Sequence, residues 1–83
     1  MKVLVVEDEK RILQFVTKGL EEAGFSVDGC ETGDEGLLRA TTQSYDAIVL
    51  DIMLPGRDGL SVLRQVREKK NVVPVILLTA RTS

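Results

Sequence analysis

The stretch 47–59 constrains the fold more than any other part of this chain. Four apolar residues precede Asp51, and a Pro55-Gly56 turn follows within a few residues. An uninterrupted apolar run of this length is typical of a strand buried on both faces, as in a parallel sheet. An aspartate at the carboxyl end of such a strand lies where open α/β sheets bind their ligands. Taken alone, the run is equally consistent with an aspartate that has no ligand and only starts a turn. The other strands decide between a ligand-binding aspartate and a turn-forming one.

Short apolar segments alternate with segments of helical periodicity along the whole chain. The predicted strands are 3–6, 25–30, 47–51 and 74–78. The predicted helices are 10–23, 33–42 and 59–70. The resulting order is βαβαβαβ, which indicates an α/β protein with a parallel sheet and right-handed crossovers.

Residues at the helix ends support these boundaries. Thr32 and Glu35 have the spacing of a reciprocal capping box, and Asp58 is placed to cap the third helix. Gly24 is expected to end the first helix, and Asn71 to end the third in the left-handed conformation. The expected buried rows of the first and third helices are Ile12, Phe15, Val16, Leu20 and Ala23, and Leu60, Leu63 and Val66.

The strand patterns also predict the order of the sheet. Strand 25–30 alternates and belongs at an edge, whereas the first and third strands are uniformly aliphatic and belong inside. The predicted order is 2-1-3-4, so the topology reverses between strands 1 and 3, and a crevice opens at their carboxyl ends. Those ends carry Glu7, Asp8 and Asp51, with Thr79 at the end of the neighbouring strand.

Three acids in one crevice need a use, because carboxylates about 5 Å apart repel by roughly 3 kcal/mol per pair at an effective dielectric of 20. Either one acid stays protonated for acid/base work, or a divalent cation neutralises the group. The chain has no histidine, and it lacks a D-x-D-x-D-G loop, which favours Mg²⁺ over Zn²⁺ or Ca²⁺. Beside Mg²⁺, Asp51 is the best candidate for a nucleophile that accepts a phosphoryl group, with Glu7 and Asp8 holding the metal and Thr79 donating to a phosphoryl oxygen.

Composition excludes several other classes of protein. The chain has 83 residues, enough for at most one small domain. Its net charge of −2 does not indicate the basic surface that binds nucleic acid. No apolar run approaches the roughly 20 residues that span a bilayer, and no membrane contact is expected. The single cysteine, Cys30, cannot form an internal disulfide, so a cytoplasmic location is expected.

Three motifs resemble the receiver domain of two-component response regulators, in particular the branch with a winged-helix DNA-binding domain. They are Val-Val-Glu-Asp-Glu at 5–9, Asp-Ile-Met-Leu-Pro-Gly-Arg-Asp-Gly at 51–59 and Pro-Val-Ile-Leu-Leu-Thr-Ala at 74–80. The resemblance covers the whole chain. It implies a flavodoxin-like, three-layer α/β fold and a phosphoacceptor module that uses Mg²⁺.

The resemblance also assigns roles to single residues. Asp51 is similar to the phosphoacceptor of the family, Thr79 to its switch hydroxyl, and Ala80 to the small residue that leaves room for the phosphoryl group. The implied metal ligands are Asp8, Asp51, the backbone carbonyl of Met53 and, mainly through water, Glu7.

The same resemblance implies partners and an organisation. The expected donor is a phosphohistidine on a sensor histidine kinase, and DNA is reached only through an effector domain absent from residues 1–83. Receivers of this family continue through a further helix, strand and helix that supply a lysine and an aromatic switch residue. We therefore expect these residues to be the N-terminal two-thirds of a receiver, impaired in phosphorylation, and to dimerise through the edge of strand 74–78 and a bare sheet face.

Other functions fit less well. The chain is expected to catalyse its own phosphorylation and dephosphorylation rather than turn over other substrates; phosphatases that form aspartyl-phosphates commonly carry a second aspartate where this chain has Met53. A dinucleotide-binding half-domain needs Gly-x-Gly-x-x-Gly after the first strand, which is absent. The main alternative is a non-signalling folded or assembly fragment that only binds divalent metal.

Overall fold

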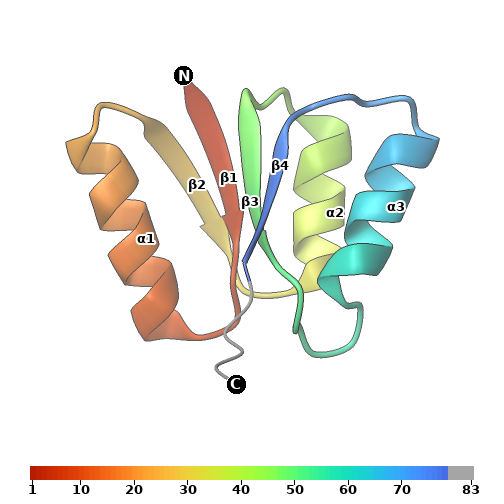
Figure 1. The fold of residues 1–83 in the computed structure, drawn as a ribbon, viewed down its shortest axis with the longest axis horizontal. Helices are drawn as coiled ribbons and strands as arrows, with labels where there is room; N and C mark the ends of the chain where they lie inside the picture. The colour runs from red at the N-terminus through yellow and green to blue at the C-terminus, as the bar shows by residue number, and fades with distance from the viewer. Residues whose placement is uncertain (79–83) are drawn as a thin grey trace.

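A four-stranded parallel sheet lies between two layers of helices (Figure 1). The structure is a computed structural model that describes residues 1–78. Its elements are β1 (Lys2–Val6), α1 (Lys10–Glu22), β2 (Ser26–Cys30), α2 (Gly33–Thr42), β3 (Ala47–Asp51), α3 (Gly59–Glu68) and β4 (Val75–Leu78). The sheet order is β2-β1-β3-β4, so the predicted order and the predicted edge position of β2 are confirmed.

The helices cover both faces of the sheet, with α1 on one side and α2 and α3 on the other (Figure 1). Successive residues of β1 and β3 therefore face opposite cores, and this explains why both strands are uniformly aliphatic. Val3, Val5 and Val49 belong to the cluster that packs against α1. The larger cluster, on the side of α2 and α3, consists of Leu4, Val6, Cys30, Ala40, Ile48, Leu50, Leu54, Val62, Val66 and Val73.

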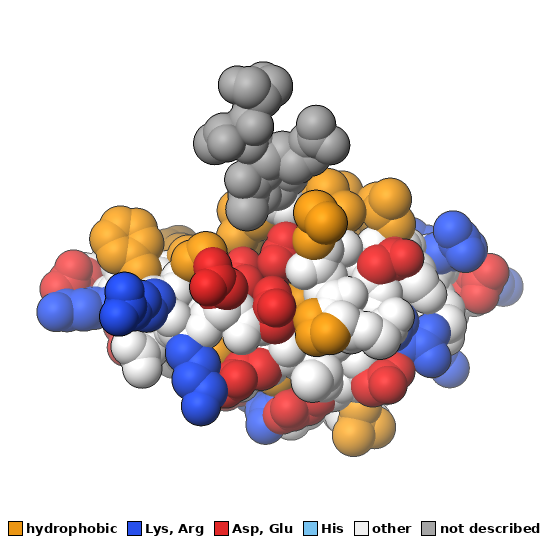
Figure 2. Space-filling view, turned by 90° about the horizontal axis from the view of Figure 1, so that it is seen from below, with side chains coloured by type: hydrophobic (Ala, Val, Ile, Leu, Met, Phe, Trp, Pro, Cys, Tyr) orange, Lys and Arg blue, Asp and Glu red, His pale blue; other side chains and the backbone are white. Residues whose placement is uncertain are grey.

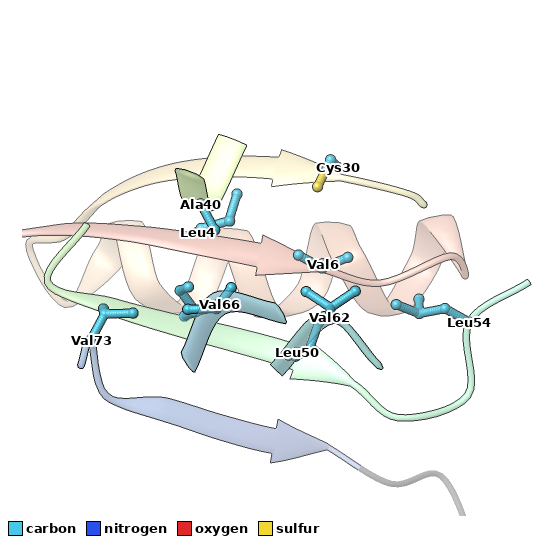
Figure 3. Packing of buried hydrophobic residues seen from close by; sticks show 10 residues of the cluster. Leu4, Val6, Cys30, Ala40, Leu50, Leu54, Val62, Val66 and Val73 are labelled. Carbon is cyan, nitrogen blue, oxygen red and sulfur yellow. The ribbon is translucent and has the colours of Figure 1, made fainter. Parts of the chain in front are cut away.

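Figure 3 shows how the larger cluster holds the loop after β3. Val62 and Val66 of α3 pack over the sheet, and Leu54, which lies in the loop between β3 and α3, points into the same core. Leu54 is only 7% exposed. Burying a leucine side chain contributes about 2 kcal/mol, so this residue ties the loop to the body of the domain.

Two of the predicted helix starts are confirmed. The Thr32 hydroxyl accepts a hydrogen bond from the Glu35 amide at 3.2 Å, and the Asp58 carboxylate accepts one from the Ser61 amide at 2.8 Å. The reciprocal half of the capping box was wrong. The Glu35 carboxylate accepts from the Arg39 side chain at 3.0 Å, because the i,i+4 charged partner on the exposed face is the stronger attraction.

The helix ends follow the predicted chemistry with one exception. Gly24 has φ +98° and its amide donates to the Glu21 carbonyl, as expected for a glycine that ends α1. After α3, however, Lys70 and not Asn71 takes the left-handed conformation, with φ 61°. The Asn71 side chain instead accepts from the Val73 amide at 3.0 Å and shapes the turn into β4.

The predicted buried rows were wrong at two large residues and at Ala23, which is exposed. Phe15 is 79% exposed and Leu60 is 47% exposed, whereas Leu13 and Val62 pack in the core. Shifting a row of apolar residues by one position along a helix gives a second row with nearly the same periodicity. Which of the two rows is buried depends on how the helix is rotated against the sheet. Within residues 1–78, no helix is long and apolar enough to cross a membrane.

Candidate functional site

Three carboxylates meet at the carboxyl end of the sheet. Val6 of β1 pairs with Leu50 of β3, so the next residues, Glu7 and Asp51, emerge side by side. Carboxylate oxygens of Glu7, Asp8 and Asp51 lie within 4.8 Å of one another. Figure 2 views this end of the molecule and shows acidic side chains gathered near its centre. The structure thus brings together the three acids that the strand patterns placed at one crevice.

Two of these carboxylates are buried and held by backbone amides. Glu7 is 4% exposed and Asp51 is 6% exposed, whereas Asp8 is more open to solvent. One oxygen of Glu7 accepts from the Glu9 amide at 2.8 Å, and one oxygen of Asp51 accepts from the Met53 amide at 3.1 Å. These bonds orient both side chains and leave the second oxygen of each for a proton, a cation or another ligand.

The site is short of positive charge. None of the ion pairs formed among residues 1–78 includes these three carboxylates. Burial, together with the neighbouring Asp51 and hydrogen bonds to Asp8 and Asp51, raises the pKa of Glu7 to about 7, against the opposing effect of the Glu9 amide. A buried acid with no cation beside it favours its neutral form, so Glu7 keeps its proton to a higher pH than an ordinary glutamate does.

The donor set fits a hard divalent cation. Carboxylate oxygens are the ligands that Mg²⁺ prefers, and it is commonly held by one or two of them together with water and phosphate. Of the three acids, only Asp8 lines the neighbouring hollow of about 520 Å³, which it shares with Met53, Pro55 and Leu60.

Glycine begins α3 for a steric reason that the sequence patterns did not indicate. A Cβ at Gly59 would overlap the carbonyl oxygen of Asp51, and the Gly59 amide donates to the Ile52 carbonyl at 2.9 Å. The glycine therefore lets the chain fold back closely over the end of β3. A glycine at the first position of a helix, where it is a poor helix former, was the available signal.

Two residues with predicted roles, Thr79 and Ala80, lie outside the described residues. Their roles stay predictions. The last described contact on this strand is the hydrogen bond from the Ile52 amide to the Leu78 carbonyl at 3.1 Å, which joins the end of β4 to the end of β3.

The model of the response regulator receiver domain matches residues 3–83 of this chain. The chain belongs to the response regulator receiver family. The family resemblance that the three motifs indicated is thereby confirmed.

Curated relatives of this receiver are transcriptional regulators. It is 49% identical over 81 residues to the transcriptional activator protein IrlR of Burkholderia pseudomallei, an overlap that covers 98% of this chain and 35% of that protein. It is 46% identical over 80 residues to the transcriptional regulatory protein ResD of Bacillus subtilis, covering 96% of this chain and 33% of that protein. The chain thus spans about a third of the length of these relatives.

Solved receivers share the fold. The receiver domain of the Francisella response regulator 1452 is 41% identical with a TM-score of 0.93, and the match covers 99% of this chain and 68% of that one. TrrA of Thermotoga maritima, solved in complex with Mg²⁺-BeF, is 40% identical with a TM-score of 0.92. The match covers 98% of this chain and 70% of TrrA. TrrA was also solved in complex with the histidine kinase ThkA. That structure matches with 39% identity and a TM-score of 0.89, and the match covers 99% of this chain and 71% of that one. The expected flavodoxin-like α/β fold is confirmed.

Proposed function

We propose that this receiver accepts a phosphoryl group from a histidine kinase on Asp51, at a site that holds Mg²⁺. The observation that carries the proposal is the meeting of three carboxylates within 4.8 Å at the carboxyl end of the sheet. Two of them are buried, and among the described residues none forms an ion pair. Such a cluster is costly to fold unless a bound cation or a proton compensates it.

The positions of the acids suggest a different role for each of them at the metal. Asp8, as the more exposed acid, is the proposed direct metal ligand, with Asp51 and the Met53 carbonyl beside it. Glu7 has one oxygen committed to the Glu9 amide, which suits a contact to the metal through water. Bound Mg²⁺ would neutralise the acids and the phosphoryl oxygens and so lower the repulsion between them.

The proposed chemistry is a single transfer. An oxygen of the Asp51 carboxylate forms a bond to phosphorus while the bond from phosphorus to the histidine nitrogen of the donor breaks. The hydrogen bond from the Met53 amide fixes the Asp51 carboxyl group for this attack. The proposed roles of Thr79 as the switch hydroxyl and Ala80 as the small neighbour rest on the family motif at 74–80.

The relatives support a histidine kinase as the partner and the regulation of transcription as the output. TrrA has been solved with a histidine kinase and with Mg²⁺-BeF, and IrlR and ResD regulate transcription. We therefore propose a sensor histidine kinase as the partner, a cytoplasmic location, and DNA contact only through an effector domain outside residues 1–83. We also propose that the chain catalyses its own phosphorylation and dephosphorylation and is not an enzyme of other substrates.

Two measurements test this proposal. Mg²⁺ titration followed by NMR should shift the amides of Asp8, Asp51 and Met53 first. Incubation with acetyl phosphate and Mg²⁺ should then add an acid-labile phosphate, detected by mass spectrometry, but more slowly than in a receiver that carries the further lysine. Metal-dependent shifts without any phosphate would favour the alternative, a non-signalling fragment that only binds divalent metal. If no shift occurs at these amides, the proposed site is wrong.

Self-association of these 83 residues is a separate part of the proposal. Ile76 is 57% exposed and Leu77 is 37% exposed on β4, which pairs only with β3 among the described strands. An apolar strand edge without charge recruits another strand, so a two-fold dimer through β4 and the adjacent sheet face is the simplest arrangement.

A further inference from the structure

The first residue of α2 lies directly against the loop that joins β3 to α3. Gly33 is buried, and a Cβ added there would overlap the backbone carbonyl oxygen of Arg57. Gly33 does not have a positive φ, unlike Gly24 and Gly56. Its backbone conformation is therefore open to alanine, which is the better helix former by about 1 kcal/mol. The close approach of the loop, and not the backbone angle, is what requires glycine here.

An ion pair lies next to this contact. The Arg57 Nε atom is 2.7 Å from the Asp34 carboxylate, and the same guanidinium is 3.4 Å from the Ser61 hydroxyl. The Asp34 side chain is 78% exposed, so the pair is a weak one. The buried backbone contact between Gly33 and Arg57 is consequently the main restraint, and the ion pair reinforces it.

The contact reaches the candidate site through a short, restrained loop. Residues 52–58 separate the end of β3 from the start of α3. Leu54 anchors the middle of the loop in the core, and the Met53 amide donates to the Asp51 carboxylate at one end. Gly33 meets the other end at Arg57. A displacement at Arg57 therefore moves a segment whose opposite end holds Met53 and Asp51.

We propose that Gly33 is a positioning residue for the site: by lacking a side chain, it lets α2 hold the 52–58 loop where the Met53 carbonyl and the Asp51 carboxylate face the metal. This inference rests on the proposed Mg²⁺ function. Gly33 touches neither the metal nor the phosphoryl group. It acts on both through the backbone of the loop.

The test compares Gly33→Ala with Gly19→Ala by NMR. Gly19 is a matched control because it lies in α1, where an added Cβ has nothing within 4 Å. In EDTA, Gly33→Ala should shift the amide resonances of residues 52–58, and in Mg²⁺ titrations its Kd for Mg²⁺ should rise by about tenfold, as for other residues that orient metal ligands. Gly19→Ala should change neither quantity.

A second control distinguishes an effect on the position of the 52–58 loop from a general loss of stability. Val66→Ala removes buried volume at the far end of α3 from the loop, and it should lower the melting temperature while leaving the Kd for Mg²⁺ within about twofold. If Gly33→Ala gives wild-type loop shifts and a wild-type Kd, the inference is wrong. If the wild-type chain binds no Mg²⁺, the proposed function fails, and the spectra in EDTA still decide whether Gly33 positions the loop.

A milder variant covers the case in which Gly33→Ala does not fold. Asp34→Asn keeps the shape of the side chain and an oxygen that can accept from Arg57, and it removes the negative charge that pairs with the guanidinium. Its amides over residues 53–57 should exchange with solvent about two- to fivefold faster, the range expected for losing an exposed pair. Unchanged exchange in this variant would overturn the part of the inference that gives the ion pair a reinforcing role.

Discussion

Replacing Glu7 by glutamine should make the metal-free protein more stable at neutral and alkaline pH. The buried carboxyl group has its pKa raised from 4.5 to about 7, so the folded state binds its proton more tightly than the unfolded state does. Stability from this group is greatest below about pH 4.5, falls as the pH rises towards 7, and is constant above that. Glutamine removes the charge and keeps an oxygen that can accept from the Glu9 amide.

The size of the effect follows from the two pKa values. A difference of 7 − 4.5 = 2.5 corresponds to about 3 kcal/mol at 1.36 kcal/mol per unit, of which about 2 kcal/mol falls between pH 5 and pH 8. A domain of this length has a total stability of about 4–12 kcal/mol, so the loss is easily measured. The chain has no histidine to contribute in the same range, and the N-terminal amine is common to both variants.

Urea unfolding followed by far-UV circular dichroism is a suitable assay, at equal protein concentrations because self-association would add stability. In EDTA, wild type should lose about 2 kcal/mol between pH 5 and pH 8, and Glu7→Gln much less. Glu21→Gln, an exposed acid of α1, should follow wild type within about 0.5 kcal/mol.

Excess Mg²⁺ provides the second half of this experiment. It should restore most of the lost stability to wild type at alkaline pH, because the cation replaces the proton at the cluster. Glu7→Gln should gain less from Mg²⁺. Parallel pH profiles for wild type and Glu7→Gln in EDTA would refute the reasoning, since they would mean that Glu7 does not take up the proton.

Three further predictions test the site, a helix end and the sheet edge. Asp51→Asn should abolish the acid-labile phosphate formed with acetyl phosphate, while Asp46→Asn, which precedes the opposite end of β3, should retain it; label on Asp51→Asn would identify another acceptor. Lys70→Gly should raise the free energy of unfolding by up to about 1 kcal/mol, because φ at this residue is 61° and glycine adopts it without strain. Lys69→Gly, where φ is −84°, should lower it, and the opposite ranking would contradict the strain argument. Light scattering should detect a dimer of these 83 residues at tens of micromolar, and Ile76→Lys should shift it towards monomer; a wild-type monomer would exclude the β4 edge as an interface.

The position of the three acids followed from local patterns alone. Uniform aliphatic runs identify inner parallel strands, alternation identifies the edge strand, and the acids directly follow the runs at residues 3–6 and 47–50. The caps at Thr32 and Asp58 were equally predictable, because a cap bonds to an amide only three residues away. These features depend on neighbours in the chain, so the sequence is enough to determine them.

Other features depended on how distant segments pack. Whether Phe15 or Leu13 faces the sheet is decided by the rotation of α1 against β1 and β2, and both choices satisfy helical periodicity. The raised pKa of Glu7 requires burial and the approach of Asp51, which is 44 residues away (51 − 7). Gly33 is needed only because Arg57 passes over it. The chain by itself thus determined which residues gather at the site, and the tertiary structure decided their charge state and their support, because desolvation and steric contact exist only once separate elements are packed together.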